Sequence, residues 1–137
     1  MFQHILVAYD GSDASERAFR VAVALARAFK GRLRVVAVCE LPASPLDAVP
    51  VVVEDQRTWT ENALAGLVRS VPPEECAIDS EVGFGVPAKV LLDQAAAHAV
   101  DHIVLGRTGK GGIARLLLGS VSRDVSGAAK VGVTLVP

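Results

Sequence analysis

The stretch from residue 105 to residue 122, LGRTGKGGIARLLLGSVS, places closely spaced glycines and basic side chains between two apolar segments. Glycine at this density is costly in backbone entropy, so it marks either a solvated loop or a close approach of the backbone to a ligand. Two residues separate Gly106 from Gly109, and nine more lead to Gly119 and Ser120. The question is whether this spacing forms a cradle for an anion.

A phosphate suits this arrangement. If Gly119 and Ser120 open a helix, the free N–H groups and the dipole of its first turn point at an anion. The hydroxyls of Ser120 and Ser122 can donate further hydrogen bonds. Four nearby cations could offset the charge of a polyphosphate: Arg107, Lys110, Arg115 and Arg123. The alternative is a solvated loop in which Ser120 is an ordinary N-cap.

Alternating hydrophobic periods predict the elements that position this stretch. Buried strands are predicted at residues 2–9, 33–40, 76–82, 102–105 and 131–136. Helices are predicted at residues 13–30 and 53–71, from Pro87 onward, and at 120–129. The first helix is predicted to end at Gly31 as its C-cap and to bury Ala14, Ala18, Val21, Ala22, Leu25 and Phe29. Three prolines between residues 41 and 50 predict an irregular loop.

Five strands alternating with four helices indicate one α/β domain over residues 1–137. Its fold is expected to be a five-stranded, parallel, doubly wound, Rossmann-like sheet with helices on both faces. In such sheets a ligand binds beyond the carboxyl ends of the strands, where the strand order reverses. With the order 3-2-1-4-5, that point lies between the strands that end at Asp10 and at Gly106.

The sequence also predicts roles for residues outside the glycine stretch. Asp10 either shapes an Asx-turn before the first helix or accepts a hydrogen bond from a ribose hydroxyl. Tyr9 is expected to be partly buried beside the site, and Trp59 to be a core or interface residue in preference to one that stacks on a base. Cys39 and Cys76 are predicted to lie too far apart for a disulfide. The three histidines are scattered without ligand spacing, so no metal site is predicted.

The composition argues against several classes of protein and of binding surface. Hydrophobic residues make up 51% of the chain and the formal net charge is −1, which argues against a disordered tail, a nucleic-acid-binding surface and a polybasic membrane patch. No apolar run approaches the roughly 20 residues that span a bilayer. The first residues, MFQHILVAYDGS, lack the features of a signal peptide, so a cytoplasmic protein is expected.

The chain resembles the universal stress protein family over essentially its whole length. The segments HILVAYDGSDAS, GVPAKVLLDQAAAHAVDHIVLGRTG and LLLGSVSRDVSGAAKVGVTLVP carry the resemblance. The ATP-binding members share the spacing Gly, two residues, Gly, nine residues, Gly, Ser or Thr, which this chain matches. The resemblance implies that ATP is the ligand, with any Mg²⁺ held through its phosphates. It also implies a homodimer paired through the last strand, Val131–Val136.

The same resemblance implies roles for individual residues. Asp10 would hold the ribose, and the backbone of Val38 would meet the adenine edge. The phosphates would be surrounded by Gly106, Arg107, Gly109, Gly119, Ser120, Val121 and Ser122. Three neighbours complete the expected nucleotide site: Ala8, Tyr9 and Leu105.

Three functions remain open from the sequence. The glycine stretch contains no histidine, glutamate or glutamine that could position an attacking water, so we expect a regulatory protein that holds ATP with slow or no hydrolysis and has no catalytic residues. The alternatives are a slow ATPase or phosphotransfer enzyme, and a protein-interaction module without nucleotide. Three other patterns do not fit. A receiver domain needs an aspartate after the third strand, a dinucleotide fingerprint needs its glycines after the first, and a Walker loop needs Ser or Thr after Lys110.

Overall fold

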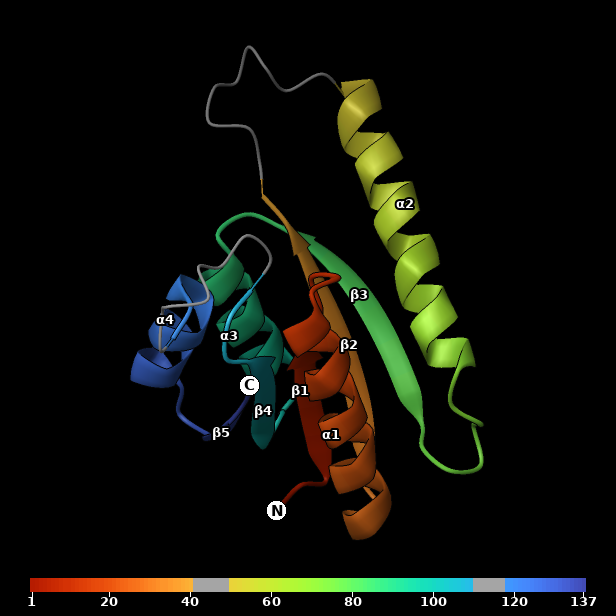
Figure 1. Cartoon of the computed structure of the whole chain (residues 1–137), viewed down its shortest axis with the longest axis vertical. Helices are drawn as coiled ribbons and strands as arrows, with labels where there is room; N and C mark the ends of the chain where they lie inside the picture. Colours follow the sequence, from red (N-terminus) through yellow and green to blue (C-terminus); the bar gives the residue numbers. More distant parts are fainter. Residues whose placement is uncertain (41–49, 110–117) are drawn as a thin grey trace.

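Five parallel strands form one sheet in the order β3-β2-β1-β4-β5, as predicted (Figure 1). The computed structural model describes residues 1–40, 50–109 and 118–137. The strands are β1 (His4–Ala8), β2 (Arg32–Cys39), β3 (Ile78–Phe84), β4 (His102–Gly106) and β5 (Gly132–Val136). The helices are α1 (Asp13–Phe29), α2 (Pro50–Arg69), α3 (Pro87–Ala97) and α4 (Ser120–Ala128).

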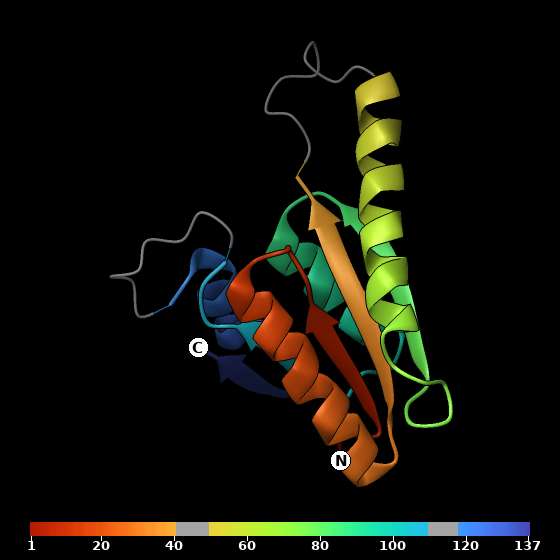
Figure 2. The same cartoon turned by 45° about the vertical axis from the view of Figure 1, so that its right-hand side comes forward.

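The helices lie in two layers, with α1 and α2 on one face of the sheet and α3 and α4 on the other (Figures 1 and 2). Along β1, Ile5 and Val7 pack toward α1, whereas Leu6 packs toward α3. All three are fully buried. A strand covered on both faces reads as a continuous apolar run, which is why HILVA and HIVLG predicted the central strands correctly.

Helix α1 begins where the sequence predicts, because the Ser12 side chain accepts a hydrogen bond from the Ser15 amide at 3.1 Å. Its buried face differs from the prediction. The buried residues are Ala14, Ser15, Ala18, Phe19, Ala22, Val23 and Ala26. Phe29 is 45% exposed and packs its ring against Phe2 beyond the sheet, so its assignment to the core was wrong.

The role predicted for Gly31 was also wrong. Lys30, with φ of 55°, takes the left-handed position that ends α1. Gly31 is instead needed for a close approach, because a Cβ there would overlap the Phe2 carbonyl oxygen and lie 2.9 Å from that of Gln3. The amide of Gly31 donates to the Ala26 carbonyl at 2.8 Å, which closes the helix end.

The remaining boundaries shift by a few residues. Helix α2 already begins at Pro50, and residues 41–49 of the predicted loop lie outside the described residues. Strand β3 runs two residues later than predicted. Cys39 and Cys76 are both buried free thiols, which confirms that they form no disulfide. Within residues 1–40, 50–109 and 118–137, no helix is long and apolar enough to cross a membrane.

Candidate functional site

A cavity of about 790 Å³ opens at the carboxyl ends of β1, β2 and β4. Its other walls are one face of α2 and the starts of α3 and α4. Eleven of the twelve predicted site residues line it: Ala8, Tyr9, Asp10, Val38, Leu105, Gly106, Gly109, Gly119, Ser120, Val121 and Ser122. The strand order brings these segments together, because β1 lies between β2 and β4 in the sheet.

Asp10 occupies the turn that joins β1 to α1. Its Oδ1 accepts a hydrogen bond from the Ser12 amide at 2.9 Å, and Gly11 between them has a φ of 84°. This is the Asx-turn that the sequence allowed. The other carboxylate oxygen faces the loop after β4, since a Cβ on Gly109 would lie 3.0 Å from Asp10 Oδ2. The carboxylate is thereby held at the cavity wall, and its contact with a ribose stays a prediction.

The start of α4 presents backbone N–H groups to the cavity. The first hydrogen bond within the helix runs from the Arg123 amide to the Gly119 carbonyl at 3.0 Å. The amides of Ser120, Val121 and Ser122 therefore precede the helical ladder and have no acceptor within α4. All three residues line the cavity, so this end of the site is suited to an anion.

The hydroxyl of Ser122 has a different role from the predicted one. It donates to the Gly106 carbonyl at 2.6 Å, and the residue is only 4% exposed. Its hydroxyl proton is thus already used to join α4 to the end of β4. Gly106 is required by packing, because a Cβ there would lie 2.9 Å from the Cβ of Ala14 on α1. Both residues hold the shape of the cavity through contacts within the protein.

Arg107 is the predicted site residue that does not line the cavity. It is exposed, its amide donates to the Val136 carbonyl at 2.7 Å, and its carbonyl accepts from the Gly119 amide at 2.8 Å. Its backbone therefore links the end of β5 to the start of α4. Arg123 is also exposed on α4 and does not line the cavity, and Lys110 and Arg115 lie outside the described residues.

Tyr9 is partly buried beside the cavity, as predicted. Its hydroxyl donates to Glu16 Oε1 at 2.6 Å. Burial, together with the hydrogen bond to Glu16 and its charge, raises the pKa of Tyr9 to about 12. The phenol is therefore neutral at physiological pH, and its hydrogen bond to Glu16 connects the end of β1 to α1.

Helix α2 supplies a cavity wall that the sequence did not predict. Its lining residues are Gln56, Trp59, Thr60 and Ala63. Trp59 is 70% exposed, so it does not belong to the core, and its predicted interface role stays a prediction. The spacing of these four residues places them on one helical face, but only the position of α2 shows that this face borders a cavity. Thr108, Pro87 and Leu91 are further lining residues that sequence reasoning missed.

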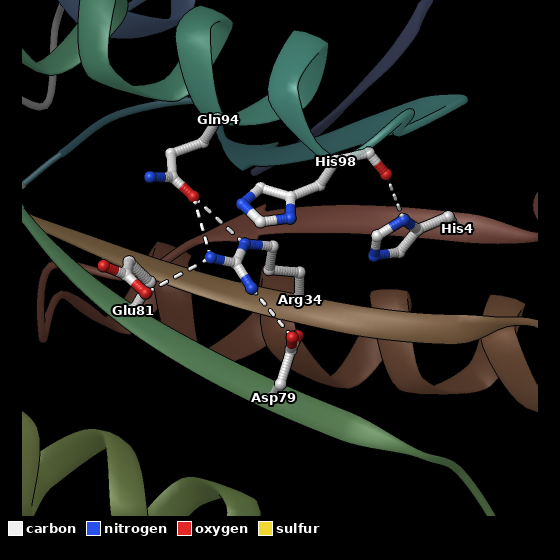
Figure 3. Close-up of polar contacts among 6 residues, drawn as sticks. All are labelled: His4, Arg34, Asp79, Glu81, Gln94 and His98. Atoms are coloured by element: carbon white, nitrogen blue, oxygen red, sulfur yellow. Dashed lines mark hydrogen bonds and ion pairs between the residues drawn. The ribbon is translucent and has the colours of Figure 1, made fainter.

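A second polar cluster lies on the α3 side of the sheet (Figure 3). Arg34 of β2 is 5% exposed and binds two carboxylates of β3, Asp79 at 2.7 Å and Glu81 at 3.2 Å. Its Nε and Nη2 donate to Gln94 Oε1 of α3 at 3.0 and 2.9 Å. None of these side chains lines the cavity. The cluster fixes α3 on β2 and β3 and is a structural feature.

The metal-ligating side chains of the described part of the chain do not gather into a site. There, no group of three or more histidine, cysteine, aspartate or glutamate residues is placed to hold a metal ion. His4 and His102 are both buried, which lowers the pKa of each below its usual range. Each ring has a partner: His4 Nδ1 lies 2.8 Å from the His98 carbonyl oxygen, and His102 Nε2 lies 2.7 Å from Thr134 Oγ1.

Comparison with known proteins agrees with this architecture. Residues 1–137 match the universal stress protein family. A universal stress protein of Thermus aquaticus is 37% identical over 141 residues, which cover 99% of each chain. The solved structure of UspA from Lactobacillus plantarum is similar with a TM-score of 0.89 at 28% identity, covering 99% of this chain and 98% of that one. The universal stress protein of Archaeoglobus fulgidus in complex with dAMP is similar with a TM-score of 0.69 at 26% identity, covering 98% of both chains. This chain therefore belongs to the universal stress protein family.

Proposed function

We propose that this protein binds ATP in the cavity between β1 and β4 and serves as a regulatory component, with hydrolysis slow or absent. The observation that carries the proposal is the joining of three features in one cavity: the Asp10 turn, the end of β2 and the open start of α4. The Archaeoglobus fulgidus relative in complex with dAMP supports an adenine nucleotide as the ligand class.

The chemistry of the walls suggests one orientation. The buried side chains of Val36, Leu91 and Leu105 form an apolar region, which suits an adenine ring next to the Val38 backbone. Asp10 would accept a hydrogen bond from the ribose. The phosphates would then meet Gly109 and the amides at the start of α4, where the helix dipole and free N–H groups offset negative charge. Any Mg²⁺ would be held through the phosphates.

Slow hydrolysis follows from the side chains available. Among the described residues that line the cavity, Asp10 and Glu40 are the only carboxylates, no histidine is present, and the one glutamine, Gln56, lies on the α2 wall and not at the start of α4. One oxygen of Asp10 is held by the Ser12 amide, and Glu40 follows β2, on the side assigned to adenine. Rapid hydrolysis needs a group that orients water at the terminal phosphate. We therefore propose stoichiometric binding rather than turnover.

The test begins with freshly purified protein. After denaturation, ion-pair chromatography of the supernatant measures adenine nucleotide per chain, and calorimetric titration with ATP follows on nucleotide-free protein. The expected result is close to one ATP per chain or saturable ATP binding, with no steady-state phosphate release. Recovery of ADP or AMP with sustained phosphate release would indicate an enzyme. Absence of both copurified nucleotide and binding would favour the protein-interaction module.

We further propose that the protein forms a homodimer through the last strand. Within the described sheet, β5 is an edge strand, paired with β4 on one side. An apolar edge strand is protected from uncontrolled association when a second copy covers it. Light scattering during size-exclusion chromatography should give twice the 14.3 kDa chain mass, and Val133→Lys should return the monomer. A dimer of unchanged stability in this variant would point to another interface.

A further inference from the structure

One face of α2 forms a cavity wall with an unusual composition. Gln56, Trp59, Thr60 and Ala63 follow the spacing i, i+3, i+4 and i+7, and all four line the cavity. Trp59 is the single tryptophan of the chain and is 70% exposed. An indole left this open to solvent loses most of the stabilisation that its burial would provide. Packing among the described residues therefore does not account for a tryptophan at this position.

Contacts on neighbouring sides of α2 hold this face toward the cavity. Thr60 Oγ1 lies 3.6 Å from the Cys39 Sγ at the end of β2. The guanidinium carbon of Arg57 lies 4.7 Å from the centre of the Phe84 ring at the end of β3, which is within cation–π range. Because both strand ends hold the helix, its rotation is set by tertiary contacts. Trp59 is presented at the cavity as a consequence.

We propose that Trp59 stacks on the nucleobase and is a positioning residue for the ligand. This inference rests on the proposed function and assigns base recognition within that same site. The apolar side chains of Val36 and Leu91 line the cavity, and α2 adds an aromatic face to its wall. A purine ring inserted there gains a flat aromatic partner, and the indole loses exposed apolar surface. The phosphate end, at α4, is formed by different residues.

The size of the effect follows from stacking energies. Base–aromatic stacking contributes about 1–3 kcal/mol per base, and an indole that starts as exposed as Trp59 belongs at the lower end. Trp59→Leu, which keeps apolar volume but removes the aromatic face, should weaken ATP binding about tenfold. Trp59→Phe should lose much less. The matched control is Thr58→Ala, an exposed neighbour on α2 that does not line the cavity.

The experiment uses the intact protein with ATP and with tripolyphosphate, which lacks the base and the ribose. Calorimetry measures binding to wild type and to the three variants, and the emission of the single tryptophan is recorded during the titrations of wild type and Thr58→Ala. The expected result is quenched emission with ATP only, and weaker ATP binding in Trp59→Leu. Tripolyphosphate should bind wild type and Trp59→Leu equally, because its contacts lie at α4.

Three results would overturn the inference in distinguishable ways. Wild-type ATP affinity in Trp59→Leu, together with unchanged tryptophan emission when ATP is added to wild type, would show that ATP binds without Trp59 and leave the proposed function intact. Failure of wild type and the Thr58→Ala control to bind ATP would overturn both. An affinity loss of the same size for tripolyphosphate and ATP would assign Trp59 to the shape of the cavity and not to the base.

Discussion

Replacement of Gly109 by alanine separates binding from folding at this site. Gly109 does not have a positive φ, so its backbone accepts alanine without strain. The new Cβ would lie 3.0 Å from Asp10 Oδ2, closer than ordinary van der Waals contact. Because Oδ1 of the same carboxylate is held by the Ser12 amide, Oδ2 must shift by a few tenths of an ångström along the cavity wall to relieve this contact.

The two effects of this change differ in size. Gly→Ala at a permitted φ stabilises a protein by about 0.4–1 kcal/mol through the unfolded state, and the tight contact with Asp10 offsets this gain. The free energy of unfolding should therefore change by less than about 1 kcal/mol. A hydrogen bond between the ribose and a charged acceptor contributes about 1.5–3 kcal/mol. Complete loss of this hydrogen bond would weaken ATP binding about 10- to 150-fold, which is the upper bound for Gly109→Ala because the carboxylate is displaced and not removed.

Calorimetric titration with ATP and urea unfolding should be run together on a set of glycine variants. Gly106→Ala places a Cβ 2.9 Å from that of Ala14, so it should lower the free energy of unfolding by about 1–3 kcal/mol. Gly127→Ala meets open space on α4 and should stabilise slightly without affecting binding. Wild-type ATP affinity in folded Gly109→Ala would refute the role assigned to Asp10 and its contact with the loop after β4.

Two further predictions concern stability, each followed by urea unfolding. Arg34→Met should lower the free energy of unfolding by only about 1 kcal/mol. The carboxylates of Asp79 and Glu81 are 63% and 47% exposed, so water can hydrate them when the guanidinium is removed. Replacing both Asp79 and Glu81 by neutral residues should lower the free energy of unfolding by about 3 kcal/mol, because a buried guanidinium then has no counter-ion. A larger loss for Arg34→Met than for this double variant would contradict this account. Because burial lowers the pKa of His102, the unfolded chain binds the proton more readily, so stability should fall as pH drops from about 6.5 through the folded pKa. His102→Gln should reduce this dependence between about pH 7.5 and 5 and leave the part that comes from His4, whose pKa is also lowered, and an unchanged slope would exclude His102 as a source.

The fold could be predicted because its strands and the starts of its helices can be recognised from local sequence. Apolar runs covered on both faces, such as HILVA in β1, differ from polar-faced strands in the sequence itself. Ser12 and Pro87 mark helix starts through their own backbone chemistry. The parallel direction of the strands then follows from the alternation of strands and helices. The errors at Phe29 and Gly31 arose at a helix end, where contact with residues 2 and 3 decides which side chain is buried and which backbone must come close.

The candidate site likewise has features that local sequence determines and features that depend on tertiary contacts. The sequence by itself determined the glycine spacing at Gly106, Gly109 and Gly119, and the turn at Asp10, because backbone freedom and turn chemistry depend on residue type and spacing. Only the tertiary structure decided that the Ser122 hydroxyl binds Gly106 and that Trp59 borders the cavity. These outcomes depend on how α4 and α2 pack on the sheet. The type of a residue limits the hydrogen bonds and contacts that it can make, but the groups that it contacts here belong to segments distant in the chain.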